Sequence, residues 1–134
     1  MDTTTIGTVW GPRVLSVLRI VAGLLVLQYG LAKLFGWPVV GMFKNLQWLS
    51  LYGVSGMFEL IGGVLLILGL FTRPAAFVLS GEMAAAYFIE HFPHGFFPVL
   101  NHGDLAVSLC FIFFYLAFAG GGPWSLDALR RKKN

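Results

Sequence analysis

The sequence predicts an all-α integral membrane protein in which four transmembrane helices form a bundle. Hydrophobic residues make up 57% of the 134 residues and charged residues 11%, and the mean hydropathy is +0.80. A soluble domain carries about 25% charged residues, so nine basic and six acidic residues are too few to cover the surface of a water-soluble protein of this length. This composition excludes an ordinary cytosolic domain, a disordered segment and a nucleic-acid-binding module.

Four apolar stretches are long enough to cross a bilayer, which takes about 20 helical residues. They cover residues 14–35, 51–71, 74–92 and 103–119, and we expect residues 1–134 to form a single membrane domain with a basic tail at 128–134. These runs lack the alternation of apolar and polar residues that a transmembrane barrel needs. The chain is therefore predicted to be helical throughout the membrane.

Small and polar residues recur every three or four positions on the first two stretches. Such spacing places them on one helix face, and small residues let helices approach closely in lipid. These faces are therefore expected to point into the bundle. The first face comprises Ser16, Arg19, Gly23, Val26, Gly30 and Lys33, and the second comprises Tyr52, Ser55, Gly56, Glu59, Gly62 and Gly63.

The third and fourth stretches carry one interior ionisable group each. Glu82 shares its face with small alanines on the third, and Asp104 is expected to begin an inward-facing stripe with Ser108, Phe111 and Tyr115 on the fourth. Only residues 72–73 separate the second and third stretches, so these helices should be antiparallel neighbours. Residues 36–50 and 92–102 are predicted to be interfacial loops.

Lysine and arginine predict the orientation. With four spans, both termini and the turn at 72–73 share one side, which collects six basic residues against Lys33 and Lys44 on the other. Positive charge is retained on the cytoplasmic side. We therefore expect an inner, plasma-membrane protein of bacterial type with both termini in the cytoplasm.

Charged groups at membrane depth cost about 2.5–3.5 kcal/mol each, so they normally face a partner or a cavity. Arg19 and Glu82 lie at similar depths from the cytoplasmic side, at 1.5 Å per residue, and are predicted to form a buried pair. That pair could fix helix register or belong to a ligand site. Glu59, without an obvious partner, suits proton handling.

A second polar layer is expected nearer the outer face. Glu59 and Lys33 are its candidate catalytic residues, and its candidate ligand-binding residues lie at neighbouring depths. His91, His94 and His102 could in principle bind a metal with Asp104, but loop histidines at an interface are usually ordinary polar residues, so we expect no metal site. The ligand-binding candidates of the two layers are Arg19, Tyr29, Glu82, His91 and Asp104.

Several short motifs, taken in order, resemble those of the DoxX family of membrane proteins over about residues 14–127. The first helix contributes Arg19-x-x-x-Gly23 and Tyr29-Gly30-x-x-Lys33-x-Phe35, and the second contributes Glu59-x-x-Gly62-Gly63. Further matches are residues 68–73, Glu82-Met83 with His91, Asn101 with Asp104, and the ending at residues 120–127. The resemblance implies a four-helix inner-membrane protein.

What the resemblance implies about activity is redox chemistry with a membrane quinone. The family's namesake is similar to a subunit of a thiosulfate:quinone oxidoreductase, and relatives are linked to thiol systems. We therefore expect a membrane subunit of a quinone-linked sulfur or thiol redox system, with a quinone as the possible cofactor and with lipid, a sulfur or thiol compound, other subunits or further copies of the chain as partners. The alternative is a non-enzymatic membrane scaffold or a small-solute transport module.

Overall fold

The longest element of the fold is α2 (Gly11–Phe35). The computed structural model describes residues 2–133, and within that range the chain forms helices and turns without strands. A short helix α1 (Thr3–Thr5) and a π-helical turn (Ile6–Trp10) lead into α2. Pro12 fits the first turn of α2, where no amide donor is needed. Gly36 ends the helix in the left-handed conformation, with φ 69°.

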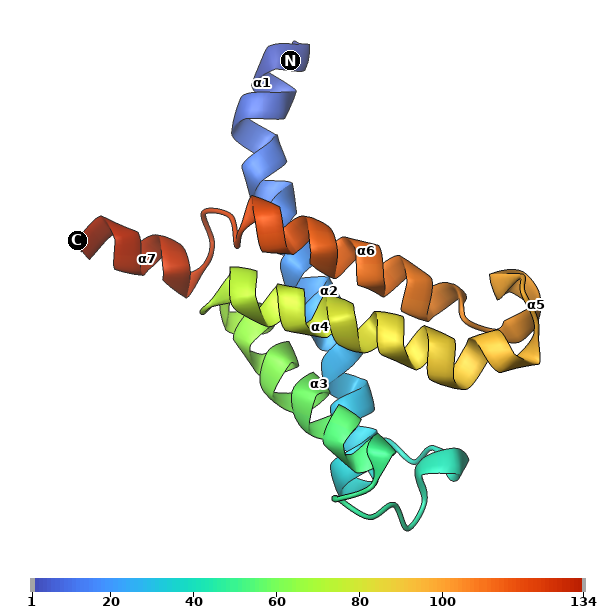
Figure 1. The fold of residues 1–134 in the computed structure, drawn as a ribbon. Helices are drawn as coiled ribbons and strands as arrows, with labels where there is room; N and C mark the ends of the chain where they lie inside the picture. The colour runs from blue at the N-terminus through green and yellow to red at the C-terminus, as the bar shows by residue number, and fades with distance from the viewer. Residues whose placement is uncertain (1, 134) are drawn as a thin grey trace.

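The helix α3 (Leu51–Leu68) packs against α2 as an antiparallel partner (Figure 1). Ser50 caps its first turn by accepting a hydrogen bond from the Gly53 amide. The two backbones touch at Gly30, where an added Cβ would lie 2.6 Å from the Leu60 nitrogen. The prediction that small residues of both helices face each other is therefore confirmed.

A second antiparallel pair is formed by α4 (Thr72–Ala86) and α6 (Asp104–Ala119). A π-helical segment (Tyr87–His91) and a 3-10 turn (Phe92–His94) extend α4, and α5 (Pro98–Asn101) lies in the connection to α6. The amphipathic helix α7 (Leu126–Lys133) follows α6 after a glycine-rich turn. Another 3-10 turn (Gly41–Phe43) lies in the loop between α2 and α3.

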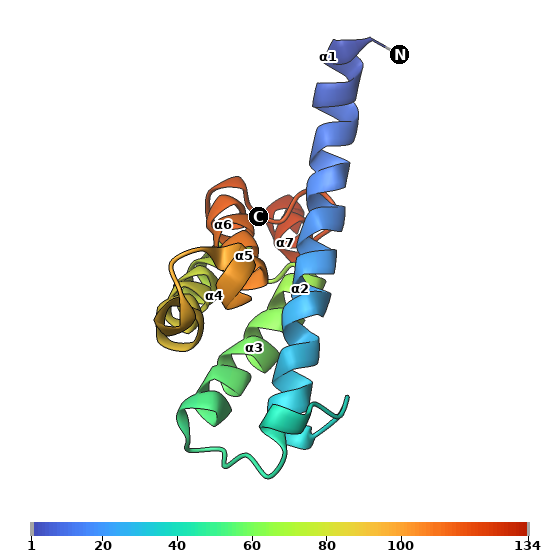
Figure 2. The ribbon, with the colours of Figure 1, turned by 90° about the vertical axis from the view of Figure 1, so that its right-hand side faces the viewer.

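The two helix pairs cross steeply and diverge from a common corner. Figure 1 shows α4 and α6 leaving the α3–α4 turn in a different direction from α2 and α3, and in Figure 2 they are viewed nearly end-on while α2 runs lengthwise. An apolar core joins the pairs near that corner. Its fully buried side chains include Val26, Leu66, Leu79, Leu109, Phe113 and Leu116.

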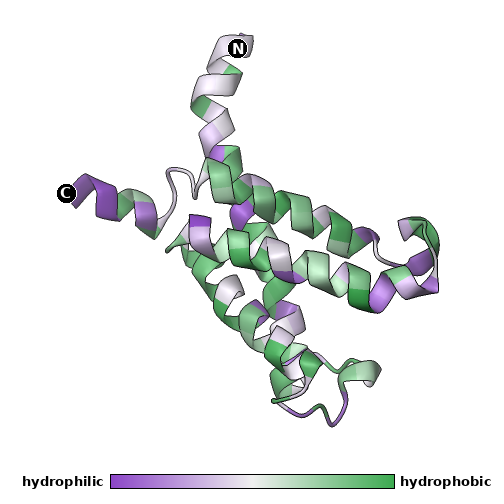
Figure 3. Cartoon of the chain, in the orientation of Figure 1, coloured by the Kyte–Doolittle hydropathy of each residue, from purple (hydrophilic) through white to green (hydrophobic). Residues whose placement is uncertain are grey.

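The outward faces of the helices are apolar, which is the reverse of a soluble bundle. Val21 and Leu24 on α2 and Ile61 on α3 are about half-exposed or more, and Figure 3 shows hydrophobic residues along the outer surfaces and hydrophilic ones gathered on α7. Within residues 2–133, two helices, Thr3–Phe35 and Leu51–Leu68, are long and apolar enough to cross a membrane, and Asp104–Ala119 is a shorter apolar helix. All-helical structure is thus confirmed, and four membrane spans stay a prediction.

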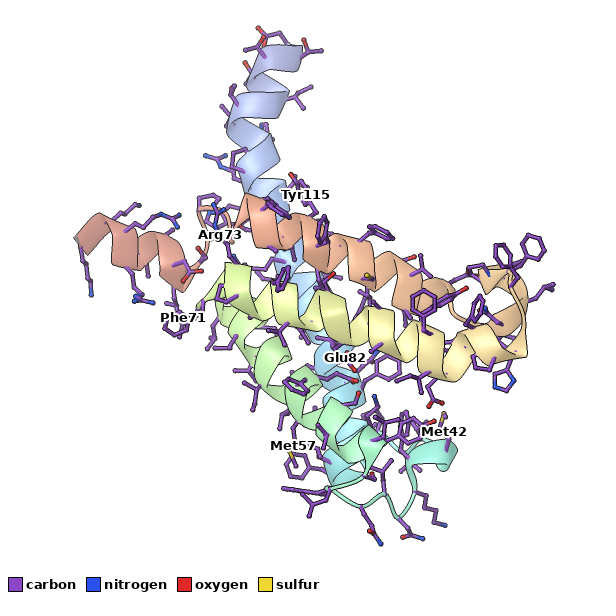
Figure 4. The ribbon with its side chains drawn as sticks, viewed as in Figure 1. Met42, Met57, Phe71, Arg73, Glu82 and Tyr115 are labelled. Carbon is purple, nitrogen blue, oxygen red and sulfur yellow. The ribbon has the colours of Figure 1, made fainter. Side chains whose placement is uncertain are left out.

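The expected inward stripe on α6 is wrong. Ser108, Phe111 and Tyr115 are exposed, and Figure 4 shows Tyr115 pointing away from α4. Helix α6 instead packs into the core with α4 through a different face, one that carries no ionisable side chain. The residues that it buries are Ala106, Leu109, Phe113 and Leu116.

Candidate functional site

Arg19 lies at the corner where the two helix pairs meet, with 1% of its surface exposed. Its guanidinium donates from Nε to the Leu66 carbonyl at 2.7 Å, from Nη1 to the Gly121 carbonyl, and from Nη2 to the Trp124 carbonyl at 2.8 Å. The planar fork of arginine suits several acceptors at fixed directions. We call Arg19 with Ser16 and the bound segment 120–127 the arginine clasp.

Ser16 and Asp127 complete the clasp. The Ser16 hydroxyl donates to the Gly121 carbonyl at 3.2 Å and accepts from the Trp124 amide at 3.1 Å. The Asp127 carboxylate accepts from the amides of Phe71 and Thr72, both at 2.9 Å, and so caps the start of α4 from a distant part of the chain. Partial burial by itself would raise the pKa of Asp127, but these hydrogen bonds, together with nearby Arg130, outweigh it and lower the pKa.

The predicted pair between Arg19 and Glu82 is not formed. The three hydrogen bonds of Arg19 all go to backbone carbonyls, whereas Glu82 bonds to Ser55 on α3. The prediction failed because matching depth does not specify which neighbouring helix a side chain meets. Arg19 reaches unpaired carbonyls near the end of α3 and in the glycine-rich turn, and no side-chain pattern reveals those acceptors.

A second polar group lies between α2, α3 and α4, and we call it the carboxylate centre: Lys33, Ser55, Glu59 and Glu82. Lys33 Nζ lies 2.5 Å from Glu59 Oε1, which is the ion pair found among residues 2–133. Ser55 Oγ lies 3.0 Å from Lys33 Nζ, 2.7 Å from Glu59 Oε1 and 2.5 Å from Glu82 Oε1. The structure therefore brings together both candidate catalytic residues and Glu82. Ser55 joins them, as the four-residue spacing to Glu59 could have indicated.

The carboxylate centre retains unused hydrogen-bonding capacity. Within the described part of the chain, three buried side-chain oxygens have no partner: Glu59 Oε2, Glu82 Oε2 and the Thr72 hydroxyl near the clasp. A buried polar atom without a partner costs about 1–3 kcal/mol. Two such atoms in one cluster indicate a place for an additional donor.

A cavity of about 380 Å³ opens beside the carboxylate centre, in the angle between the two helix pairs. Figure 4 shows Glu82 lying in this angle, with Met42 of the α2–α3 loop on its far side. Tyr29 and His91, both candidate ligand-binding residues, line the cavity with Lys33. Its apolar walls include Val26, Met42, Phe43, Met83, Ala106 and Leu109. The volume lies within the range of about 300–1,000 Å³ that is typical of small-molecule sites.

The cavity mouth is held by contacts that the sequence did not predict. The Tyr52 hydroxyl on α3 bonds to the Glu90 carboxylate on the segment after α4, which links the two helix pairs. The Phe43 ring packs on Tyr52, with ring centroids 5.8 Å apart, and lies 5.3 Å from Lys33 Nζ. The loop residues are therefore part of the cavity wall.

Asp104 is not part of this site. Its side chain is exposed at the start of α6 and does not line the cavity, whereas its neighbour His102 does. Nearby, buried Asn101 donates to the Tyr87 hydroxyl and the Gly95 carbonyl and accepts from the Gly103 amide. These bonds fix the turn before α6. Among residues 2–133 no three His, Cys, Asp or Glu side chains are grouped to hold a metal ion.

Comparison with known proteins shows to which family the chain belongs. The chain is 42% identical over 124 residues to an uncharacterised protein of Haemophilus influenzae, covering 87% of this chain and 90% of that one. It is 30% identical to an uncharacterised membrane protein of Mycobacterium tuberculosis, covering 92% and 85%. No solved structure matches the chain significantly. The model of the DoxX family matches residues 14–92, a range that includes Arg19, Lys33, Glu59 and Glu82. The resemblance noted from the sequence is thus confirmed: this chain is a membrane protein that belongs to the DoxX family.

Proposed function

We propose that the protein binds a membrane quinone in the cavity between the two helix pairs and serves as the membrane subunit of a quinone-linked redox system acting on sulfur or thiol compounds. The observation that carries the proposal is the cavity itself. It places the Lys33 ammonium, the Tyr29 ring and three histidines in a largely apolar wall. A quinone presents two carbonyl acceptors on an apolar ring with an apolar tail, which matches such a lining.

The carboxylate centre supports this role through proton supply. Reduction of a quinone to a quinol consumes two electrons and two protons. Lys33 both lines the cavity and bonds to Glu59, so proton-bearing groups lie directly behind the donor that would meet the quinone carbonyl. The electrons come from a partner redox subunit, since a single cysteine supplies no dithiol pair.

We further propose four membrane spans with both termini in the cytoplasm of a bacterial-type plasma membrane. The start of α2, the α3–α4 turn and α7 lie on one side of the fold (Figure 1). That side carries Arg13, Arg73 and the basic residues 130–133, as the positive-inside rule requires. A reporter that is active only in the cytoplasm, fused to the C-terminus of the full chain, should give a signal. Activity of a periplasm-specific reporter at the same position would contradict the orientation.

Binding of a short-tailed ubiquinone to the purified protein in nanodiscs tests the function. Quenching of the intrinsic tyrosine and tryptophan fluorescence should give a saturable binding isotherm. Lys33→Met should raise the dissociation constant at least tenfold, which corresponds to about 1.4 kcal/mol. Asp104→Asn is the matched control, because Asp104 is charged and lies near the mouth without lining the cavity. No saturable binding to folded protein would instead favour a scaffold or solute-transport module.

A further inference from the structure

We propose that the carboxylate centre holds one exchangeable proton, carried by Glu82, and that this proton is exchanged past Tyr52 and Glu90 and not through the apolar core. The proposal concerns the protein without any quinone and does not depend on quinone binding. It rests on three features: the hydrogen-bond count at Ser55, the charge balance of the cluster, and the space that connects it to the cavity mouth.

The hydrogen-bond count at Ser55 requires a protonated carboxyl group. A serine hydroxyl has one hydrogen to donate and two lone pairs that accept. Ser55 Oγ contacts Lys33 Nζ, Glu59 Oε1 and Glu82 Oε1, and the lysine is a donor. The hydroxyl can donate to only one of the two carboxyl groups, so the other must donate to it. Glu59 is the ionised member because Lys33 pairs with it, which leaves the proton on Glu82.

The charge balance leads to the same assignment. With Lys33 positive, Glu59 negative and Glu82 neutral, the buried cluster has no net charge, whereas a second ionised carboxylate would leave an uncompensated charge at membrane depth. The histidines at positions 91, 94 and 102 line the larger cavity and not the small cavity beside Ser55, and Lys33 with Glu59 is the salt bridge found among residues 2–133. Helix α6 buries only apolar side chains, and Arg19 is occupied by backbone carbonyls at the corner of the fold.

A small cavity connects the centre with the mouth. It has a volume of about 90 Å³, and its lining includes Lys33 and Ser55 of the centre as well as the hydrogen-bonded Tyr52 and Glu90. One water molecule needs about 10–15 Å³, so water can bridge the two polar groups. The remaining lining residues are Leu51, Ala85, Ala86 and Ile89.

In the opposite direction the centre meets the apolar core. Leu66 and Leu79 are fully buried there, and the leucine side chain at 79 fills the space beside Gly62. Beyond them Arg19 presents a fixed positive charge, which repels a proton. Proton exchange is therefore expected on the opposite side, where Tyr52 and Glu90 line both cavities together with Lys33.

Infrared spectroscopy of the protein in nanodiscs counts the proton directly through the carbonyl stretch of protonated carboxyl groups. At neutral pH the wild type should show one such group relative to the double variant Glu59→Gln/Glu82→Gln. Each single glutamine variant should lose the band, because the remaining carboxylate then pairs with Lys33. Lys33→Met should double the intensity of the band, because both carboxyl groups then become neutral. A wild-type protein without the band, or an unchanged band in Lys33→Met, would overturn the proposal.

Replacing each glutamate by the shorter aspartate identifies which of the two residues carries the proton. Glu82→Asp should shift the frequency of the band, whereas Glu59→Asp should leave it unchanged, since the proton resides on residue 82. The reverse pattern would contradict the assignment to Glu82.

The rate of proton–deuterium exchange after transfer of the protein into D₂O tests the route of the proton. Deuteration shifts the carboxyl band, and the rate of this shift should fall severalfold in Tyr52→Phe and Glu90→Gln without loss of band intensity. Asp104→Asn, which alters an exposed carboxylate away from the path, should exchange at the wild-type rate. Unchanged exchange in both mouth variants would exclude this route. Circular dichroism of every variant verifies that the helices are intact.

Discussion

Arg19 and Glu59 are equally buried, each with 1% of its surface exposed, yet their surroundings differ. Arg19 donates to three backbone carbonyls, which are fixed by helix ends and a tight turn and do not titrate. Glu59 faces a lysine, a serine and a second glutamate, and one of its oxygens has no partner within the described chain. Burial alone therefore does not separate a structural charge from a functional one. The partner atoms give a better criterion: backbone carbonyls are fixed acceptors and indicate a structural role for Arg19, whereas titratable neighbours and an oxygen without a partner make Glu59 a candidate for function.

The largest effect is expected from the clasp. Arg19→Met removes three hydrogen bonds to a charged donor, which contribute about 1.5–3 kcal/mol each, so the free energy of unfolding should fall by several kcal/mol. Arg19→Lys should rescue little, because a single ammonium cannot reproduce the guanidinium fork. Thermal unfolding in detergent measures both. If the lysine variant were as stable as wild type, the positive charge alone, and not the geometry of the guanidinium, would stabilise the arginine clasp.

The next largest effect lies between the two regions, at the α2–α3 contact. In Gly30→Ala the added Cβ would meet the Leu60 backbone at 2.6 Å, so the helices must separate, at a cost of about 1–3 kcal/mol. Their separation should also loosen the Lys33–Glu59 pair. Gly81→Ala is the matched control, since nothing lies within 4 Å of its Cβ position, and alanine there should stabilise α4. Equal melting temperatures for the two variants would refute the close contact.

A smaller effect is expected from the capping carboxylate of the clasp. Asp127→Asn weakens the cap on α4 and should cost about 1 kcal/mol. Because the pKa of Asp127 is lower in the folded protein, its stabilisation is complete above the unfolded value of about 3.9 and is lost as the pH falls through the lower folded value. Melting curves against pH should therefore lose acid sensitivity in the variant. If the melting temperatures of wild type and variant fell equally with decreasing pH, Asp127 would contribute nothing to the acid sensitivity of the protein.

The smallest effect on stability is expected in the carboxylate centre. Glu82→Gln replaces a neutral carboxyl group by a neutral amide of the same shape, so the free energy of unfolding should change by less than about 1 kcal/mol, the scale of one hydrogen bond. The same variant should abolish the protonated-carboxyl band. A loss of stability as large as that of Arg19→Met would place Glu82 with the structural charges and remove the distinction between the two regions.

The sequence predicts the contacting faces of α2 and α3 correctly, but not the buried face of α6 or the partner of Arg19. The three- and four-residue spacing of small and polar residues on each helix, which includes Gly30 on α2 and Glu59 on α3, predicts which sides of α2 and α3 meet, and the structure agrees. It could not predict that Arg19 binds carbonyls, because backbone acceptors are freed by helix ends and turns rather than by a side-chain pattern. A charge within an apolar run also predicts an interior position for Asp104, whereas α6 packs through Ala106, Leu109, Phe113 and Leu116 and leaves Asp104 exposed at its start.

The clasp has a consequence for the order in which the protein assembles during synthesis. Arg19 and its acceptor Gly121 are 102 positions apart, and Asp127 caps a helix that starts 55 positions before it. When α2 enters the membrane, two of the three acceptors of Arg19 have not yet been translated. The arginine must remain hydrated or bound to lipid headgroups until residues 121–127 arrive. Closure of the clasp therefore follows synthesis of residues 121–127, and a chain shortened before residue 121 would lack two of the three carbonyl acceptors of Arg19.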